Sequence, residues 1–161
     1  MSKTQFFARA AAALFYALTI SCTSTKSTDP DYIAQTEAYF QAVDNVDYEA
    51  FLALWAPDGE FLVPFLPSQN LIGYDQIATA FKPRFAAAQS AVTTRDIKKI
   101  HGAPQTLAKA QFTIDYKNGV RYENDAVILF TYNGDGRLVR LEEWIDPDRF
   151  RAAFGDPAPA E

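Results

Sequence analysis

One carboxylate interrupts an apolar strand face near the end of this 161-residue chain. Residues 137–146 read as a strand, and because successive side chains point to opposite faces, Glu143 shares a face with Val139, Leu141 and Ile145. A carboxylate facing an apolar interior costs several kcal/mol unless it is paired or protonated, and burial raises its pKa. Glu143 is therefore a candidate general acid or base. The alternative is a structural role, in which Glu143 is solvated at the mouth of a cavity or paired with an arginine.

Two tyrosines and an asparagine are candidates to complete such a site. We expect Tyr39 and Tyr116 to offer hydroxyl groups to a cavity, although buried tyrosines usually find a structural partner. Asn124 is expected to face the same way on a neighbouring strand, where it would bind a ligand or satisfy the backbone. The other predicted ligand-binding residues are apolar and would form cavity walls or plain core: Trp55, Phe61, Phe81, Phe112, Ile128 and Leu141.

The composition excludes several other chemistries. The chain has one cysteine, Cys22, and one histidine, His101, which excludes intrachain disulfides and multi-histidine metal sites. A serine–histidine–aspartate arrangement would need His101 as its base, whereas a lone histidine at a strand end is more often structural. The net charge is −5 and the basic residues are scattered, so no nucleic-acid surface is indicated. We expect no metal and no cofactor.

Three helices are expected before the main sheet. An Asp-Pro pair at residues 29–30 predicts the start of the first helix, with the aspartate as N-cap and the proline at the first helical position. Asp47 would cap a second helix, which Pro-Asp-Gly at residues 57–59 would end. A third helix is predicted to begin at residues 73–76, and Pro83 should kink or shorten it.

The strands follow mainly after these helices. A short strand is expected at residues 60–65, and longer strands are expected at 92–100, 107–117, 120–132 and 137–146. Glycine-containing turns join the last three strands into an antiparallel meander. The order of helix, helix, strand, helix and four strands predicts an α+β fold, with helices on one face of a bent antiparallel sheet.

Four segments, in this order along the chain, resemble SnoaL-like proteins of the nuclear transport factor 2-like class. They are residues 39–48, 54–61, 72–77 and 136–147, the last reading Gly-Arg-Leu-Val-Arg-Leu-Glu-Glu-Trp-Ile-Asp-Pro. The resemblance covers essentially all of residues 31–150. It implies a cone-shaped bent antiparallel sheet that encloses one pocket, with about three N-terminal helices packed on its concave face.

The resemblance does not bring a complete catalytic set with it. In ketosteroid isomerases of this class the general base falls near Val63 here, the oxyanion tyrosine matches Tyr39, and a second acid falls near Ile128. In limonene epoxide hydrolases the last acid matches Glu143, but the arginine and aspartate of that site fall near the Gln and Thr of residues 111–113. In SnoaL-type polyketide cyclases, Glu143 is the nearest match to the acid–base carboxylate.

Two functions of different classes are consistent with these residues. The first, favoured because the known bases are missing, is an exported domain that binds a small apolar or amphipathic molecule, or a protein partner, without catalysis. The second is a cyclase, isomerase or dehydratase acting on a polyketide- or steroid-like carbonyl compound. Glu143 would then be the acid or base, and Tyr39 or Tyr116 would polarise the oxygen. We also expect a homodimer through the sheet face that carries Trp144 and Leu138.

The N-terminus reads as a targeting segment. Residues 1–28 combine a basic start, an apolar run at 10–20 that is too short to span a bilayer, and a polar stretch, which predicts an export signal. Residues 18–22 resemble a bacterial lipoprotein box, which implies lipidation of Cys22; plain secretion is the alternative. The protein is therefore expected to be periplasmic or extracellular, either free or anchored to the membrane through Cys22.

The remainder of the chain is expected to form one domain. The SnoaL-like domain would span residues 29–154, and residues 155–161 would form a flexible tail.

Overall fold

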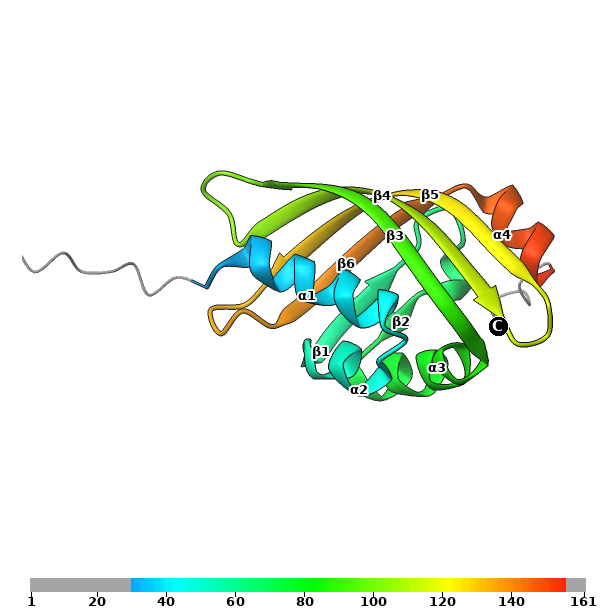
Figure 1. The fold of residues 1–161 in the computed structure, drawn as a ribbon. Coiled ribbons are helices and arrows are strands. Elements are labelled where there is room, and N and C mark those ends of the chain that lie inside the picture. Colours follow the sequence, from blue (N-terminus) through cyan, green and yellow to red (C-terminus); the bar gives the residue numbers. More distant parts are fainter. Residues whose placement is uncertain (1–29, 156–161) are drawn as a thin grey trace, which may run out of the picture.

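Six strands form one curved sheet in the computed structural model, which describes residues 30–155 (Figure 1). They are β1 (Trp55–Leu62), β2 (Leu71–Ile72), β3 (Ala88–Lys99), β4 (Gln105–Tyr116), β5 (Arg121–Tyr132) and β6 (Leu138–Ile145), and their order across the sheet is β2-β1-β6-β5-β4-β3. β4, β5 and β6 pair antiparallel in sequence order, which confirms the predicted meander. The expected export signal and Cys22 lie outside the described residues.

The sheet differs from the expected antiparallel arrangement at one pair of strands. β1 lies parallel to β6, with Glu60 opposite Arg140 and Phe61 opposite Leu141. The two strands are far apart in sequence, so no local turn signal reports the direction in which they pair. The sheet is therefore mixed, while the α+β class and the placing of helices against a curved sheet agree with expectation.

Four α-helices accompany the sheet in the described part of the chain. α1 (Tyr32–Asp44) packs against β3 and β4 in the hollow of the sheet, and α2 (Tyr48–Ala53) and α3 (Tyr74–Ala87) follow beside it (Figure 1). The short 3-10 helix η1 (Pro67–Gln69) precedes β2. α4 (Pro147–Phe154) follows β6 and packs against β5. None of the helices in residues 30–155 is long and apolar enough to cross a membrane.

Side-chain caps fix where the first two helices begin. Asp31, rather than the predicted Asp29, is the N-cap of α1, and its carboxylate accepts hydrogen bonds from two backbone N–H groups of the first turn. Tyr32, the first helical residue, stacks on Tyr132 of β5 with ring centroids 5.2 Å apart, so tertiary packing supports this start. Asp47 caps α2 as predicted.

Several elements differ from the sequence-based expectations. β1 includes residues 57–59, where the prediction ends a helix, and its pairing with β6 is irregular there. α3 runs past Pro83 and ends only at Ala87. α4 was not predicted, although Asp146 caps it and Pro147 occupies its first position. β1 and α3 continue because packing against distant residues overrides local propensity, whereas α4 follows the local Asp-Pro signal.

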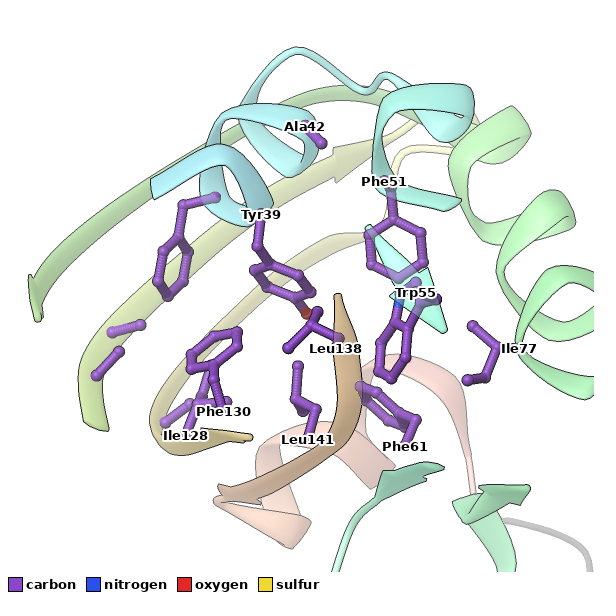
Figure 2. Packing of buried hydrophobic residues seen from close by; sticks show 14 of the residues in the cluster. Tyr39, Ala42, Phe51, Trp55, Phe61, Ile77, Ile128, Phe130, Leu138 and Leu141 are labelled. Atoms are coloured by element: carbon purple, nitrogen blue, oxygen red, sulfur yellow. The ribbon is translucent and has the colours of Figure 1, made fainter. Parts of the chain in front are cut away.

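A ring-rich core joins α1 and α2 to β1, β5 and β6. Figure 2 shows Tyr39 reaching from α1 toward Phe130 of the sheet, and Phe51 reaching from α2 toward Trp55. Phe130 and Leu141 are completely buried and lie opposite each other in register between β5 and β6. Trp55 completes this layer and packs on Phe51 with ring centroids 6.1 Å apart.

A register irregularity near the start of β6 changes which side chains face the core. Leu141 and Ile145 are buried as predicted, but Leu138, expected on the outer face, is 1 % exposed. The pairing of β5 with β6 shifts between Thr131 and Tyr132, so that Tyr132 lies opposite Leu138. Leu138 therefore cannot belong to an outer dimerisation face, which corrects that expectation.

Polar contacts fix α1 on the sheet. Arg95 of β3 forms ion pairs with Glu37 at 2.9 Å and with Asp44 at 2.7 Å, both of them on α1. Nearer the start of the helix, the buried hydroxyl groups of Thr36 and Thr106 lie 2.6 Å apart. These contacts set the rotation of α1 about its axis, which determines where the side chains of its other face point.

Candidate functional site

A cavity of about 510 Å³ lies between the inner face of the sheet and helices α1, α3 and α4. This volume falls in the range of about 300–1,000 Å³ that is typical of small-molecule sites. The wall is mostly apolar and includes Val43, Phe51, Phe61, Val63, Leu66, Phe81, Phe85, Phe112, Ile114, Ile145, Phe150 and Phe154. The polar side chains among the described lining residues are Tyr39, Gln69, Arg84, Tyr116, Asn118, Tyr122 and Glu143.

Glu143 reaches this cavity from the middle of β6, directly opposite Ile128 of β5. Its carboxylate has no hydrogen-bond or ion-pair partner within residues 30–155. Burial raises the pKa of Glu143 to about 7, and the positive charge of Arg84 only partly offsets that rise. Near neutral pH the carboxyl group is therefore present in both protonation states, as an acid–base catalyst requires.

Tyr39 projects from α1 into the same cavity (Figure 2). Its ring is 3 % exposed and packs edge-on against Phe130 at a centroid distance of 5.1 Å. The hydroxyl group forms no hydrogen bond with another described residue. Burial, and then the negative charge of Glu143, raise the pKa of Tyr39 well above its ordinary value. Tyr39 is thus a neutral hydroxyl donor within electrostatic reach of Glu143.

Two further tyrosines line the cavity from β4 and β5. Burial raises the pKa of Tyr116, whose ring packs edge-on against Phe154 of α4 at 5.6 Å. Burial and the charge of Glu143 raise the pKa of Tyr122, whose hydroxyl accepts a hydrogen bond from Asn124 at 2.9 Å. Tyr122 was not predicted as a site residue, although it shares the strand face of Asn124 two residues away.

Arg84 is the only cationic side chain among the described lining residues, and sequence analysis did not single it out. It lies in the last turn of α3, three residues after Phe81, so both side chains share one helix face. Its guanidinium lies 5.0 Å from the centroid of the Phe81 ring and donates a hydrogen bond to Gln69 at 2.9 Å. The three-residue spacing between Phe81 and Arg84 was the feature of the sequence that could have indicated Arg84 as a lining residue.

The structure divides the predicted apolar set into two groups. Phe61, Phe81 and Phe112 line the cavity, together with the predicted catalytic residues Tyr39, Tyr116 and Glu143. The other three pack within the core and are not among the lining residues: Trp55, Ile128 and Leu141. The buried indole N–H of Trp55 has no hydrogen-bond partner.

Asn124 is committed to the backbone rather than to a ligand. Its amide nitrogen donates to the carbonyl oxygen of Asp146 at 2.9 Å, and its amide oxygen accepts from the N–H of Asp146 at 3.0 Å. Asn124 is fully buried and does not line the cavity. Of its two expected roles, the structural one therefore fits, because these bonds fix the junction between β6 and α4.

Three of the positions at which the resemblance to related enzymes implies a catalytic group hold none here. Val63 contributes only hydrocarbon to the cavity wall, and Ile128 is completely buried. Gln111 lies on the outer face of β4, where its amide donates to Asp125 of β5. Within residues 30–155, no group of three or more histidine, cysteine or acidic residues is placed to hold a metal ion.

Solved structures of low sequence identity share this fold. BvnE pinacolase from Penicillium brevicompactum superposes with a TM-score of 0.66 at 16% identity, covering 75% of this chain and 89% of that one. An LEH-like epoxide hydrolase from Mycobacterium tuberculosis gives a TM-score of 0.63 at 17% identity, with coverages of 76% and 88%. A nuclear transport factor 2-like protein of unknown function from Burkholderia pseudomallei gives 0.63 at 16%, with coverages of 79% and 99%.

Sequence comparison identifies the family directly. No curated protein matches the chain. The sequence pattern of the SnoaL-like domain, however, matches residues 36–141, which is more than half of the chain and includes Tyr39, Arg84 and Tyr116. Together with the mixed curved sheet and its helices, this match shows that the chain belongs to the SnoaL-like family and has the nuclear transport factor 2-like fold.

Proposed function

We propose that this protein is an acid–base catalyst acting on a small carbonyl compound, in the class of cyclases, isomerases or dehydratases. The observation that carries the proposal is Glu143, an unpartnered carboxyl group in an apolar cavity with a pKa of about 7. A pocket that only binds an apolar molecule gains nothing from such a group, because a buried carboxylate opposes folding. This favours catalysis over the binding function that the missing bases first suggested.

The geometry suits removal of a proton next to a carbonyl group. The Glu143 carboxylate would accept the proton from the α-carbon, and the electron pair of the broken C–H bond would move onto the carbonyl oxygen. Tyr39, whose hydroxyl has no partner among residues 30–155, would donate a hydrogen bond to that enolate oxygen. Glu143 would then return the proton to carbon or to a leaving group.

A probe reaction tests this step without knowledge of the natural substrate. In heavy water, exchange of the α-protons of β-tetralone, a bicyclic ketone, can be followed by proton NMR. We expect the protein to accelerate exchange, with a rate that rises with pH through about 7 because the carboxylate form is the base. Glu143→Gln should lower the rate by about a hundredfold or more, and Tyr39→Phe by about a hundredfold.

Glu142 provides the matched control for the Glu143 substitution. It neighbours Glu143 on β6 but points to the outer face, where it pairs with Arg140 at 3.0 Å. Glu142→Gln should leave the exchange rate unchanged. Exchange that is equally fast in wild type and Glu143→Gln would remove Glu143 from the mechanism and restore a binding function without catalysis.

We further propose that the protein acts outside the cytoplasm, as an exported and membrane-anchored form. The support is the sequence of residues 1–28, with its basic start, apolar run and Cys22. The mass of the mature protein extracted from membranes tests this proposal. A mature chain that begins at any residue other than Cys22 rules out the lipid anchor.

A further inference from the structure

A second charged group in the cavity has no role in the proton transfer proposed above. Arg84 lies at the end of α3, where the ring of Phe81 and the amide of Gln69 hold its guanidinium in place. Its positive charge lowers the pKa of Glu143, Tyr39 and Tyr116, opposing the larger effect of burial in each case. The guanidinium therefore lies within electrostatic reach of the cavity's polar groups.

Most of the hydrogen-bonding capacity of Arg84 is unused. A guanidinium has five N–H donors, and Arg84 makes one hydrogen bond, to Gln69, and no ion pair with any carboxylate in residues 30–155. Arg95, the other half-buried arginine among residues 30–155, shows the contrast, because it is bound by Glu37 and Asp44. Arg95 thus holds the fold together, whereas Arg84 presents free donors to the cavity.

Glu143 does not neutralise Arg84. No ion pair joins the two side chains, and with a pKa of about 7 the carboxyl group of Glu143 is uncharged in a large fraction of molecules near neutral pH. The cavity then holds one unpaired positive charge beside an aromatic wall. The planar fork of an arginine matches the two oxygens of a carboxylate.

We propose that Arg84 binds the carboxylate of the molecule that occupies the cavity, which makes the site selective for amphipathic carboxylic acids. The apolar body of that molecule packs between Phe81 and Phe112, and its acid group lies at the end of α3. This inference takes the cavity from the proposed function but does not depend on catalysis by Glu143.

Two isosteric probes test the selectivity by calorimetry: β-naphthoate, which carries a carboxylate, and β-naphthamide, which does not. We expect wild type to bind the naphthoate at least about tenfold more tightly. Arg84→Gln should abolish this preference and leave the affinity for β-naphthamide unchanged, which also shows that the variant is folded. Lys82→Gln, an identical charge change at an exposed position of the same helix, should retain the preference.

Glu143→Gln separates this inference from the proposed function. The Glu143→Gln variant should bind β-naphthoate at least as tightly as wild type, because it lacks the carboxylate that repels an anion. This expectation does not depend on how the substitution changes the exchange rate of β-tetralone. Equal affinity of wild type for the two probes overturns the proposal. So does an absence of naphthoate binding, or a preference that survives in Arg84→Gln.

Discussion

Glu143 is held uncharged by its surroundings over a wide range of pH. Its strand face is otherwise apolar, and the one cation that favours its charged form, Arg84, does not pair with it. Burial therefore determines the protonation state of this carboxyl group. Such a group lowers the free energy of unfolding by an amount that depends on pH. This pH dependence can be measured separately from any catalytic activity.

Glu143→Gln should stabilise the protein at high pH and have less effect at low pH. The unfolded carboxyl group ionises near its ordinary value of 4.5, whereas the folded one stays protonated up to about 7. Below the unfolded pKa, this carboxyl group does not reduce the free energy of unfolding. The free energy of unfolding then falls as the pH rises between the two pKa values, and it stays low above pH 7. Thermal unfolding at about pH 4 and about pH 8 should show a higher Tm for the variant only at the higher pH.

The matched control is again Glu142→Gln, because Glu142 lies beside Glu143 on the opposite face of β6. Its Tm difference from wild type should not follow the same trend. A Glu143→Gln variant that is less stable than wild type at both pH values would show that Glu143 has a partner that holds its charged form.

Strand parity explains which site residues could be predicted from the sequence. Alternation alone placed Glu143, Tyr116 and Phe112 on the inner face, and all three line the cavity. It could not identify Arg84, because the rotation of α3 against the sheet depends on tertiary packing. It also could not tell that Asn124 would be used by the backbone of Asp146, since that bond joins residues 22 positions apart.

The course of strand β1 depends on a close approach between Gly59 and the side chain of Trp55. A Cβ atom on Gly59 would lie 2.8 Å from Cε3 of Trp55 and 3.1 Å from the backbone oxygen of Ala56. Trp55 is itself 1 % exposed and packs against Phe51 and Phe61. The Pro-Asp-Gly sequence resembles a helix stop, but here the glycine lets the strand pass over the indole ring.

Gly59→Ala should destabilise the protein by about 1–3 kcal/mol, because the added methyl group would have to displace Trp55 or the backbone. Gly134→Ala is the matched control, because no atom lies within 4 Å of the corresponding Cβ position in the β5–β6 turn. Chemical denaturation of both variants measures the difference. Equal stability of the two would mean that Trp55 does not pack over Gly59.

Helix starts show why local signals were only partly informative. The sequence Asp-Pro-Asp at residues 29–31 offers two possible caps, and the stacking of Tyr32 on Tyr132 accompanies the use of Asp31. The same Asp-Pro signal at Asp146 does begin a helix, α4, which places Phe150 and Phe154 at the cavity. Distant aromatic contacts, which no local pattern contains, distinguish the two cases.

For the whole molecule, the outer face of the sheet is the surface that a second copy could cover. Trp144 of β6 and Val127 of β5 border a shallow hollow there, together with Asp125 of β5 and Lys109 of β4. Val127 is 38 % exposed in the middle of this face. A homodimer through this surface remains our proposal, now without the buried Leu138.

Val127→Glu should convert such a dimer into a monomer, because it places a charge at the centre of the interface. Ile72→Glu is the control, since Ile72 is exposed on the edge strand β2. Light scattering after size-exclusion chromatography gives the molar mass of each variant. A monomeric wild type would exclude the dimer.

The titration of Glu143 itself shows whether its carboxyl group can act as an acid and a base near neutral pH. Carbon NMR of protein labelled at glutamate side-chain carboxyl groups follows the ionisation, and the signal missing from Glu143→Gln identifies the residue. We expect a midpoint of about 7 for Glu143. A midpoint near the ordinary value of 4.5 would contradict it, because the carboxyl group would then be a solvated or paired structural charge.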